Sequence, residues 1–146
     1  MNLAVFFVRA ALGAVLLVTG ALKVGHAPAL AASIAGYRLL PAQAIPAIAT
    51  LLPLFEMFVG IYLLIGLFTK VAAYVAAAQF FLYGAAIASA VVRGIPANCG
   101  CFGPNDTASA DWPHVGFDLA LAAVALLIAR FAPGSLALDR RFSKTS

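Results

Sequence analysis

The chain alternates between four long apolar runs and short polar segments. The apolar runs cover about residues 3–24, 46–68, 71–92 and 114–132. A helix needs about 20 predominantly apolar residues to cross a bilayer. Only helices and closed barrels satisfy their backbone hydrogen bonds in lipid, and these runs lack the alternation of barrel strands. The pattern predicts an all-α integral membrane four-helix bundle, with residues 1–146 forming one transmembrane domain.

The polar segments predict how these helices are connected. Residues 25–45 are too broken for a span, and their stretch ALAASIAGYRLL predicts a short interfacial helix with Tyr37 and Arg38 at headgroup depth. The tight turn at residues 68–70 predicts that the second and third spans are antiparallel neighbours. The polar tail, residues 135–146, is expected to be disordered. The first run exceeds the roughly 7–15 residues of a signal core and has no basic segment before it, so we expect it to be retained.

Composition supports a bilayer as the solvent. The chain is 64% hydrophobic and 10% charged, with a mean hydropathy of +1.05, whereas soluble domains average about 45–50% apolar residues. The net charge of +4 comes from dispersed basic residues, which argues against a nucleic-acid partner. The sequence has no phosphate-binding loop, dinucleotide glycine pattern or HExxH motif.

The basic residues also predict the orientation. Four spans place both termini on the side of the turn at residues 68–70. That side carries Lys70, Arg130, Arg140, Arg141 and Lys144, and the other carries Lys23, Arg38 and Arg93. The positive-inside rule then predicts cytoplasmic termini in a bacterial inner (plasma) membrane. The segment between the third and fourth spans would face the periplasm, where disulfides persist.

Both cysteines of the chain lie in that segment, which reads GIPANCGCFGPND over residues 94–106. The surrounding residues are turn formers, among them Gly100 and Gly103. Cys99 and Cys101 are close enough to form a disulfide, and Gly100 removes a Cβ that would obstruct the ring. By lowering the entropy of the unfolded chain, such a short ring would stabilise the folded protein by only roughly 1.5 kcal/mol. The pair therefore suits thiol–disulfide exchange better than a structural role. Capture of Cu(I) by two thiolates and a pair of inert thiols are the alternatives, and we assign no metal site.

At this point the chain resembles a known family. CGCFG after a third hydrophobic span is similar to the signature of the methylamine-utilisation MauE family, in the DoxX-like group of four-helix membrane proteins. RAALGAVLLVTGALK at residues 9–23, YRLLP at 37–41 and LLPLFE at 51–56 agree with it. The resemblance covers about residues 9–127. It implies a redox-associated inner-membrane protein of methylamine metabolism; MauE itself is linked to maturation of the disulfide-rich small subunit of periplasmic methylamine dehydrogenase. One departure is Phe117, which stands before Asp118 where the family often has Arg.

Ionisable residues inside the spans form a second candidate site. Arg9, Gly13, Gly20 and Lys23 share one face of the first helix, and Glu56 lies between the depths of the two basic residues. Glu56 can therefore pair with either. The pair could simply dock two helices, or it could form a proton path or a quinone headgroup site. The third span carries Tyr74, Gln79 and Tyr83, which could add polar contacts to this site but are expected instead to be packing and interfacial residues.

Side chains next to the cysteine pair complete the prediction. Asp111 is expected to cap the fourth helix, with Pro113 in its first turn. His114 is a candidate modulator of the thiolate. Phe102 is expected to dip its ring into the membrane surface.

The sequence supports three classes of function. The first is a thiol–disulfide exchange protein whose Cys-Gly-Cys turn serves a periplasmic redox client or a thioredoxin-like carrier through a mixed disulfide. In a stronger version the chain is an enzyme that passes electrons to a quinone; this version ranks lower because the chain has one cysteine pair. The second class is a copper-binding or small-solute membrane protein. The third is a non-catalytic scaffold for a redox partner.

Overall fold

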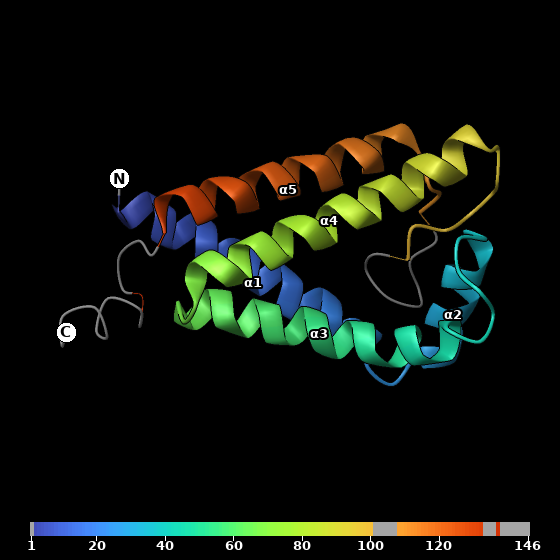
Figure 1. Cartoon of the computed structure of the whole chain (residues 1–146), viewed down its shortest axis with the longest axis horizontal. Helices are drawn as coiled ribbons and strands as arrows, with labels where there is room; N and C mark the ends of the chain where they lie inside the picture. The colour runs from blue at the N-terminus through green and yellow to red at the C-terminus, as the bar shows by residue number, and fades with distance from the viewer. Residues whose placement is uncertain (1, 101–107, 133–136, 138–146) are drawn as a thin grey trace.

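The computed structural model of the chain describes residues 2–100, 108–132 and 137. Five helices form in these residues: α1 (Asn2–Lys23), α2 (Ala27–Gly36), α3 (Ile45–Ile65), α4 (Thr69–Val92) and α5 (Trp112–Phe131). Figure 1 shows the four long helices side by side, with α2 across one end. All four are long and apolar enough to cross a membrane. The predicted all-α architecture is confirmed, including the short helix between the first and second spans; the predicted tail lies almost entirely outside the described residues.

Local sequence signals set the helix ends. Proline occupies the first turn of α2, α3 and α5, where its missing N–H costs no hydrogen bond. Gly66 ends α3 in the left-handed conformation at φ 70°, which glycine adopts without strain. Asp111 caps α5 and accepts a hydrogen bond from the backbone N–H of His114, as predicted.

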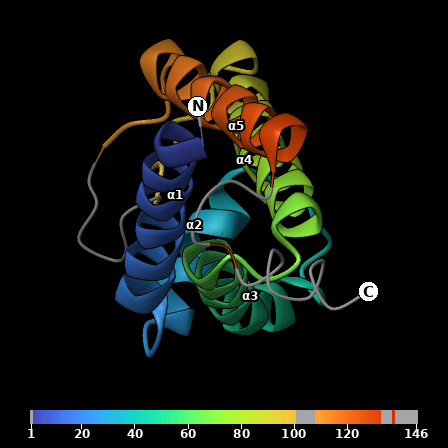
Figure 2. The same ribbon diagram turned by 90° about the vertical axis from the view of Figure 1, so that its left-hand side faces the viewer.

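The four long helices pack as two pairs. α1 packs mainly on α3, and α4 packs mainly on α5, while α3 and α4 touch far less. The turn between α3 and α4 does make them antiparallel, but the two helices diverge away from it (Figures 1 and 2). The prediction that they are close neighbours therefore holds only near the turn. α2 packs on α3 at the far end of the bundle.

Small residues allow each pair to approach closely. A Cβ added to Gly13 would lie 2.8 Å from the carbonyl oxygen of Gly60, and one added to Gly60 would lie 2.7 Å from that of Gly13. A Cβ at Gly20 would lie 2.7 Å from the carbonyl oxygen of Pro53. Alanines line the seam between α4 and α5, including Ala76 and Ala125, which are fully buried. Such contacts supply the van der Waals packing that holds membrane helices together.

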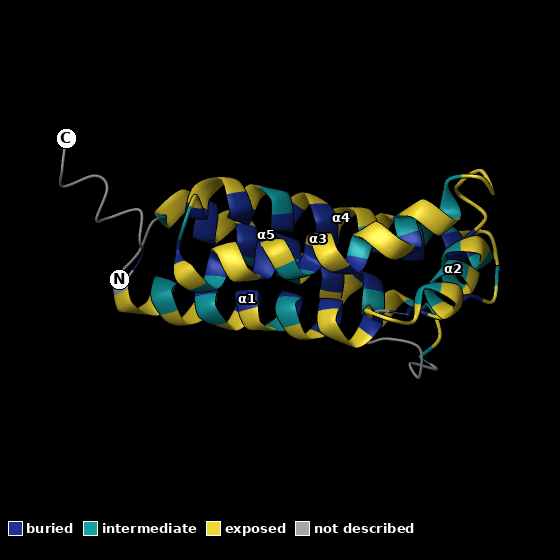
Figure 3. Ribbon diagram, turned by 90° about the horizontal axis from the view of Figure 1, so that it is seen from below, coloured by how far each residue is buried: buried dark blue, intermediate teal, exposed yellow. Residues whose placement is uncertain are grey.

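The outer faces of the helices remain apolar and exposed. Figure 3 shows many exposed positions on the long helices, and along α1 they follow the outer edge of the bundle. Phe81 is 58% exposed and Leu82 is 64% exposed, and both lie in a membrane-spanning helix. Lipid chains cover such a surface without the cost that water would impose.

Candidate functional site

A buried ion pair joins the end of α1 to the middle of α3. Lys23 is the last residue of α1, and its Nζ lies 2.8 Å from Oε1 and 2.9 Å from Oε2 of Glu56. Lys23 is 4% exposed and Glu56 is 0% exposed. Of the two partners that the sequence left open for Glu56, the structure selects Lys23. Both charges are thereby neutralised away from water, as burial requires.

Two residues of α4 extend this pair into a cluster. The hydroxyl of Tyr83 donates a hydrogen bond to Oε1 of Glu56 and accepts one from Nε2 of Gln79 at 3.1 Å. The Nζ of Lys23 lies 5.6 Å from the centre of the Tyr83 ring, within cation–π range. The structure thus gives Gln79 and Tyr83 the polar contacts that the sequence left open as the alternative to packing. Their spacing of four places them on one helix face, and that signal could have linked them.

Asp118 on α5 lies beside this cluster. It is 4% exposed, and its Oδ2 has no hydrogen-bond partner among the residues that the structure describes. A cavity of about 30 Å³ lies between Asp118, Thr19, Lys23, Glu56 and neighbouring apolar side chains. That volume, with several polar side chains in its wall, suits a bound water molecule. In the sequence, Asp118 drew attention only because Phe117 precedes it where the family often has Arg. Its position near Lys23 was not predicted.

Arg9 belongs to a different part of the bundle. It is 0% exposed, and its guanidinium lies 5.6 Å from the centre of the Phe6 ring. It also lies against Gly66, where a Cβ would collide with Nη1. The glycine that ends α3 therefore also makes room for the arginine. Arg9 lies in the N-terminal half of α1, about 21 Å from Lys23 along the helix rise.

The cysteine turn is held by a short backbone ladder. The Cys99 N–H donates to the Ala108 carbonyl at 2.8 Å, and the Ala110 N–H donates to the Ala97 carbonyl at 2.8 Å. Cys99 is 8% exposed and is disulfide-bonded. Gly100, also buried, adopts φ 65°, where a side chain would be strained. Cys101, Phe102 and Gly103 lie outside the described residues.

Tyr37 anchors the turn from the end of α2. Its hydroxyl donates to the carbonyl oxygens of Asn98 at 2.9 Å and Cys99 at 3.3 Å. The Arg93 guanidinium in turn donates to the Tyr37 carbonyl oxygen. Tyr37 is 9% exposed, so protein covers a residue that we expected at the headgroups, whereas Arg38 is exposed. This role of Tyr37 is not evident in the sequence, because the hydrogen bonds join residues that are 61 and 62 positions apart.

His114 forms two hydrogen bonds with Asp111, the residue that caps α5. Its Nδ1 lies 2.6 Å from Oδ1 of Asp111, which also accepts the His114 backbone N–H at 3.1 Å. These two hydrogen bonds, the side-chain one first, lower the pKa of Asp111 below its ordinary value of 3.8. The suggested influence of His114 on a thiolate stays a prediction.

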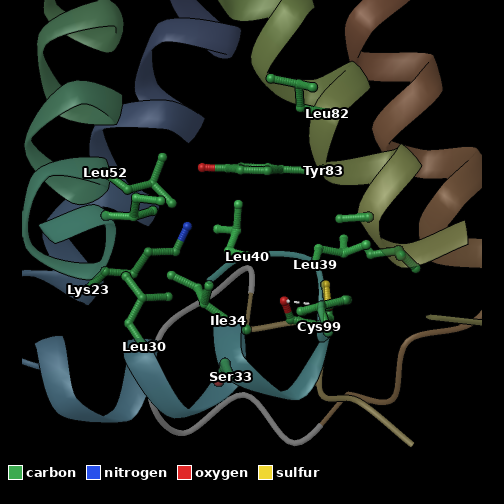
Figure 4. Close-up of a pocket in the computed structure, with 15 residues that line it drawn as sticks. Lys23, Leu30, Ser33, Ile34, Leu39, Leu40, Leu52, Leu82, Tyr83 and Cys99 are labelled. Atoms are coloured by element: carbon green, nitrogen blue, oxygen red, sulfur yellow. Dashed lines mark hydrogen bonds between the residues drawn. The ribbon is translucent and has the colours of Figure 1, made fainter. Parts of the chain in front are cut away.

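A single cavity connects the cysteine turn with the polar cluster. Its volume is about 340 Å³, and Lys23, Tyr83, Cys99 and Gly100 all line it. Figure 4 shows the Lys23 nitrogen and the Tyr83 hydroxyl facing one another on one side, with the Cys99 sulfur on the other. α2 closes the cavity below through Leu30, Ser33 and Ile34. The cysteine turn and the polar cluster around Lys23, which were predicted as two separate sites, therefore line one largely apolar cavity.

Comparisons with known proteins agree with this architecture. Residues 1–131 match the family model described as methylamine utilisation protein MauE. The chain is 33% identical over 135 residues to the methylamine utilization protein MauE of Paracoccus denitrificans, covering 92% of this chain and 68% of that protein. It is 40% identical over 98 residues to the protein of the same name from Methylophilus methylotrophus, covering 66% of this chain and 52% of the relative. No solved structure matches the chain.

Proposed function

We propose a periplasmic thiol–disulfide exchange function for this chain, which belongs to the MauE family of methylamine utilisation proteins and is a multi-pass membrane protein. In this proposal the Cys99–Cys101 disulfide is passed to a client protein or to a thioredoxin-like carrier. A client thiolate attacks one sulfur of the disulfide and forms a mixed disulfide. A second client thiolate then releases the reduced turn, so the client gains the disulfide.

The observation that carries the proposal is the setting of Cys99. Its backbone is fixed by Ala108 and Tyr37, and the residue is disulfide-bonded. A ring closed by cysteines two positions apart contributes little chain entropy, roughly 1.5 kcal/mol. The backbone around Cys99 is held rigidly although its disulfide stabilises the fold so little. This combination favours a role in exchange over a purely structural role. A disulfide-bonded Cys99 also has no thiolate to offer a copper ion, which favours exchange over copper binding.

The family resemblance suggests the client. The disulfide-rich small subunit of methylamine dehydrogenase matures in the periplasm, where the turn lies if both termini are cytoplasmic. We therefore propose that the chain assists disulfide formation in that subunit or in a comparable periplasmic redox protein.

Thiol trapping in intact cells tests this function. A membrane-impermeant maleimide is added with and without prior reduction to the wild type, Cys99→Ser and Cys101→Ser. We expect the wild-type thiols to be blocked until they are reduced and to label from outside afterwards. We also expect a mixed disulfide with the client to accumulate in one single variant, which identifies the attacked cysteine.

The double variant Cys99→Ser/Cys101→Ser is the control, because it should form no mixed disulfide. Wild-type thiols that label at once without reduction would exclude a resting disulfide. The absence of a mixed disulfide in both single variants, with the client present, would also contradict the proposal.

A further inference from the structure

We propose that the cavity beneath the cysteine turn binds the headgroup of a membrane quinone, and that this quinone re-oxidises the two cysteines after each exchange. The inference rests on the proposed exchange function and names the oxidant that this function needs. A turn that has given its disulfide to a client is left with two thiols. It can act again only if an acceptor removes two electrons and two protons.

The cavity has the size and the walls of a site for an apolar molecule. Its volume of about 340 Å³ falls within the roughly 300–1,000 Å³ typical of small-molecule sites. Apolar side chains from three helices form most of the wall, among them Ile34 on α2, Leu52 on α3 and Leu82 on α4. A substituted ring that dissolves in lipid suits such walls, whereas a hydrated solute does not.

The rim of the cavity borders the lipid. Leu82 lines the cavity and is 64% exposed on the outer face of a membrane-spanning helix. Leu39 and Leu40 line the opposite part and are 47% and 42% exposed. α3 and α4 diverge towards the end of the bundle where α2 lies and where the cavity is found (Figure 1). An occupant can therefore enter from the hydrocarbon core, where membrane quinones reside.

The polar side of the cavity offers one donor to a neutral acceptor. A lysine ammonium has three N–H donors, and Lys23 uses two of them on Glu56, at 2.8 and 2.9 Å. The Tyr83 hydroxyl already donates to Glu56. The third Lys23 donor has no acceptor among the described residues and is available to a quinone carbonyl oxygen. Glu56 cancels the charge of Lys23, so the site suits an uncharged carbonyl better than a lipid phosphate.

The cavity also brings the quinone to the sulfur. Cys99 forms part of the wall opposite Lys23 (Figure 4). In the reaction the S–H bonds of Cys99 and Cys101 break and one S–S bond forms. The two electrons and two protons go to the two quinone oxygens, and the product leaves as quinol. The Lys23 N–H stabilises the negative charge that develops on its oxygen during this reduction.

Anaerobic oxidation of the reduced full-length protein by decylubiquinone tests the inference. Quinone loss is followed by absorbance, and thiol loss is followed by maleimide labelling. We expect one quinol to form for every two thiols lost. Exchange with a reduced thioredoxin-like carrier is measured on the oxidised wild type, so the proposed exchange function is tested separately.

Matched tryptophan variants of α4 locate the site. Ala86 lines the cavity, whereas its neighbour Ala85 is exposed and lines none of the described cavities. Ala86→Trp should slow thiol oxidation by decylubiquinone at least tenfold, and Ala85→Trp should leave the rate unchanged. Thermal melting establishes that both variants fold. If Ala86→Trp does not fold, Lys23→Gln/Glu56→Gln serves instead, since it keeps a polar pair but removes the ammonium; we expect its rate to fall about tenfold.

The outcomes separate the two proposals. Wild-type thiols that decylubiquinone leaves reduced would overturn the inference, even if the oxidised protein still exchanges with the carrier. Equal rates in folded Ala86→Trp and Ala85→Trp would overturn it as well. Failure of carrier exchange, with quinone reduction intact, would overturn the exchange function and leave the quinone site standing.

Discussion

At the scale of single residues, the Lys23–Glu56 pair is the main electrostatic feature of the interior. Both residues are almost fully buried, and the acceptor Oε1 also serves Tyr83. Removing one partner of a buried pair typically costs about 3–5 kcal/mol because the other charge is left without compensation. Replacing both partners with apolar residues can cost far less.

We therefore expect Lys23→Met to lower the melting temperature of the purified protein strongly, by the equivalent of about 3–5 kcal/mol. Lys23→Met/Glu56→Met should recover most of the loss, apart from about 1 kcal/mol for the acceptor that Tyr83 loses. Melting of the two variants and the wild type in one detergent measures both effects. A double variant as unstable as Lys23→Met would show that charge compensation is not the reason for the pair.

The contact between Asp111 and His114 predicts a dependence on pH. The His114 hydrogen bonds place the folded-state pKa of Asp111 below its ordinary value of 3.8. The stability that this carboxylate contributes is thus complete above about pH 4 and is lost as the pH falls through the folded-state pKa.

Asp111→Asn isolates that effect, because asparagine also caps helices but does not titrate. As the pH is lowered below about 4, the melting temperature of the wild type should fall more steeply than that of Asp111→Asn. Parallel melting curves of the two proteins against pH would assign the acid sensitivity to other carboxylates.

At the scale of the helices, the backbones of α1 and α3 approach each other closely at two glycines. Gly13 and Gly60 each face the carbonyl oxygen of the other, at distances that leave no room for a Cβ. Gly60→Ala should force the two helices apart and cost about 1–3 kcal/mol. Gly116→Ala in α5 is the matched control, because nothing lies within 4 Å of its added Cβ. If the two variants melt alike, the close contact does not determine the stability of the pair.

The helices could be predicted from the sequence because each is specified locally. Apolar run length sets the spans, and Pro113 and Asp111 mark the start of α5. The pairing of α4 with α5 could not be predicted in this way, because alanine seams and lipid-facing surfaces are both apolar in the sequence. Hydrophobicity does not distinguish the two faces when lipid is the solvent.

The candidate site was predictable only in its parts. The thiols and the buried charges stand out by residue type. Cys99 and Lys23 line the same cavity only because of contacts between residues that are distant in sequence. These contacts are made by Tyr37 and Tyr83, and residues 37–40 complete the wall. No spacing rule relates residue 23 to residue 99.

At the scale of the whole molecule, the orientation stays a prediction, and the structure changes the count of basic residues on which it rests. Lys23 is buried in an ion pair, so it is not a loop charge for the positive-inside rule. The side with the cysteine turn is left with Arg38 and Arg93, while the opposite side keeps its five basic residues. The difference in basic residues therefore favours cytoplasmic termini more strongly than the sequence alone indicated.

Single cysteines introduced into Cys99→Ser/Cys101→Ser test this orientation without removing a lysine or an arginine. His26 is exposed between α1 and α2, and Ala132 directly follows α5. The C-terminal ends of α1 and α5 lie at opposite ends of the bundle (Figure 1). In intact cells an impermeant maleimide should label His26→Cys, and it should label Ala132→Cys only after the membrane is permeabilised. The reverse pattern would place Cys99 in the cytoplasm, where a reducing environment opposes a resting disulfide. The proposed periplasmic exchange would then be contradicted as well, because the client is proposed to receive the disulfide of Cys99 and Cys101.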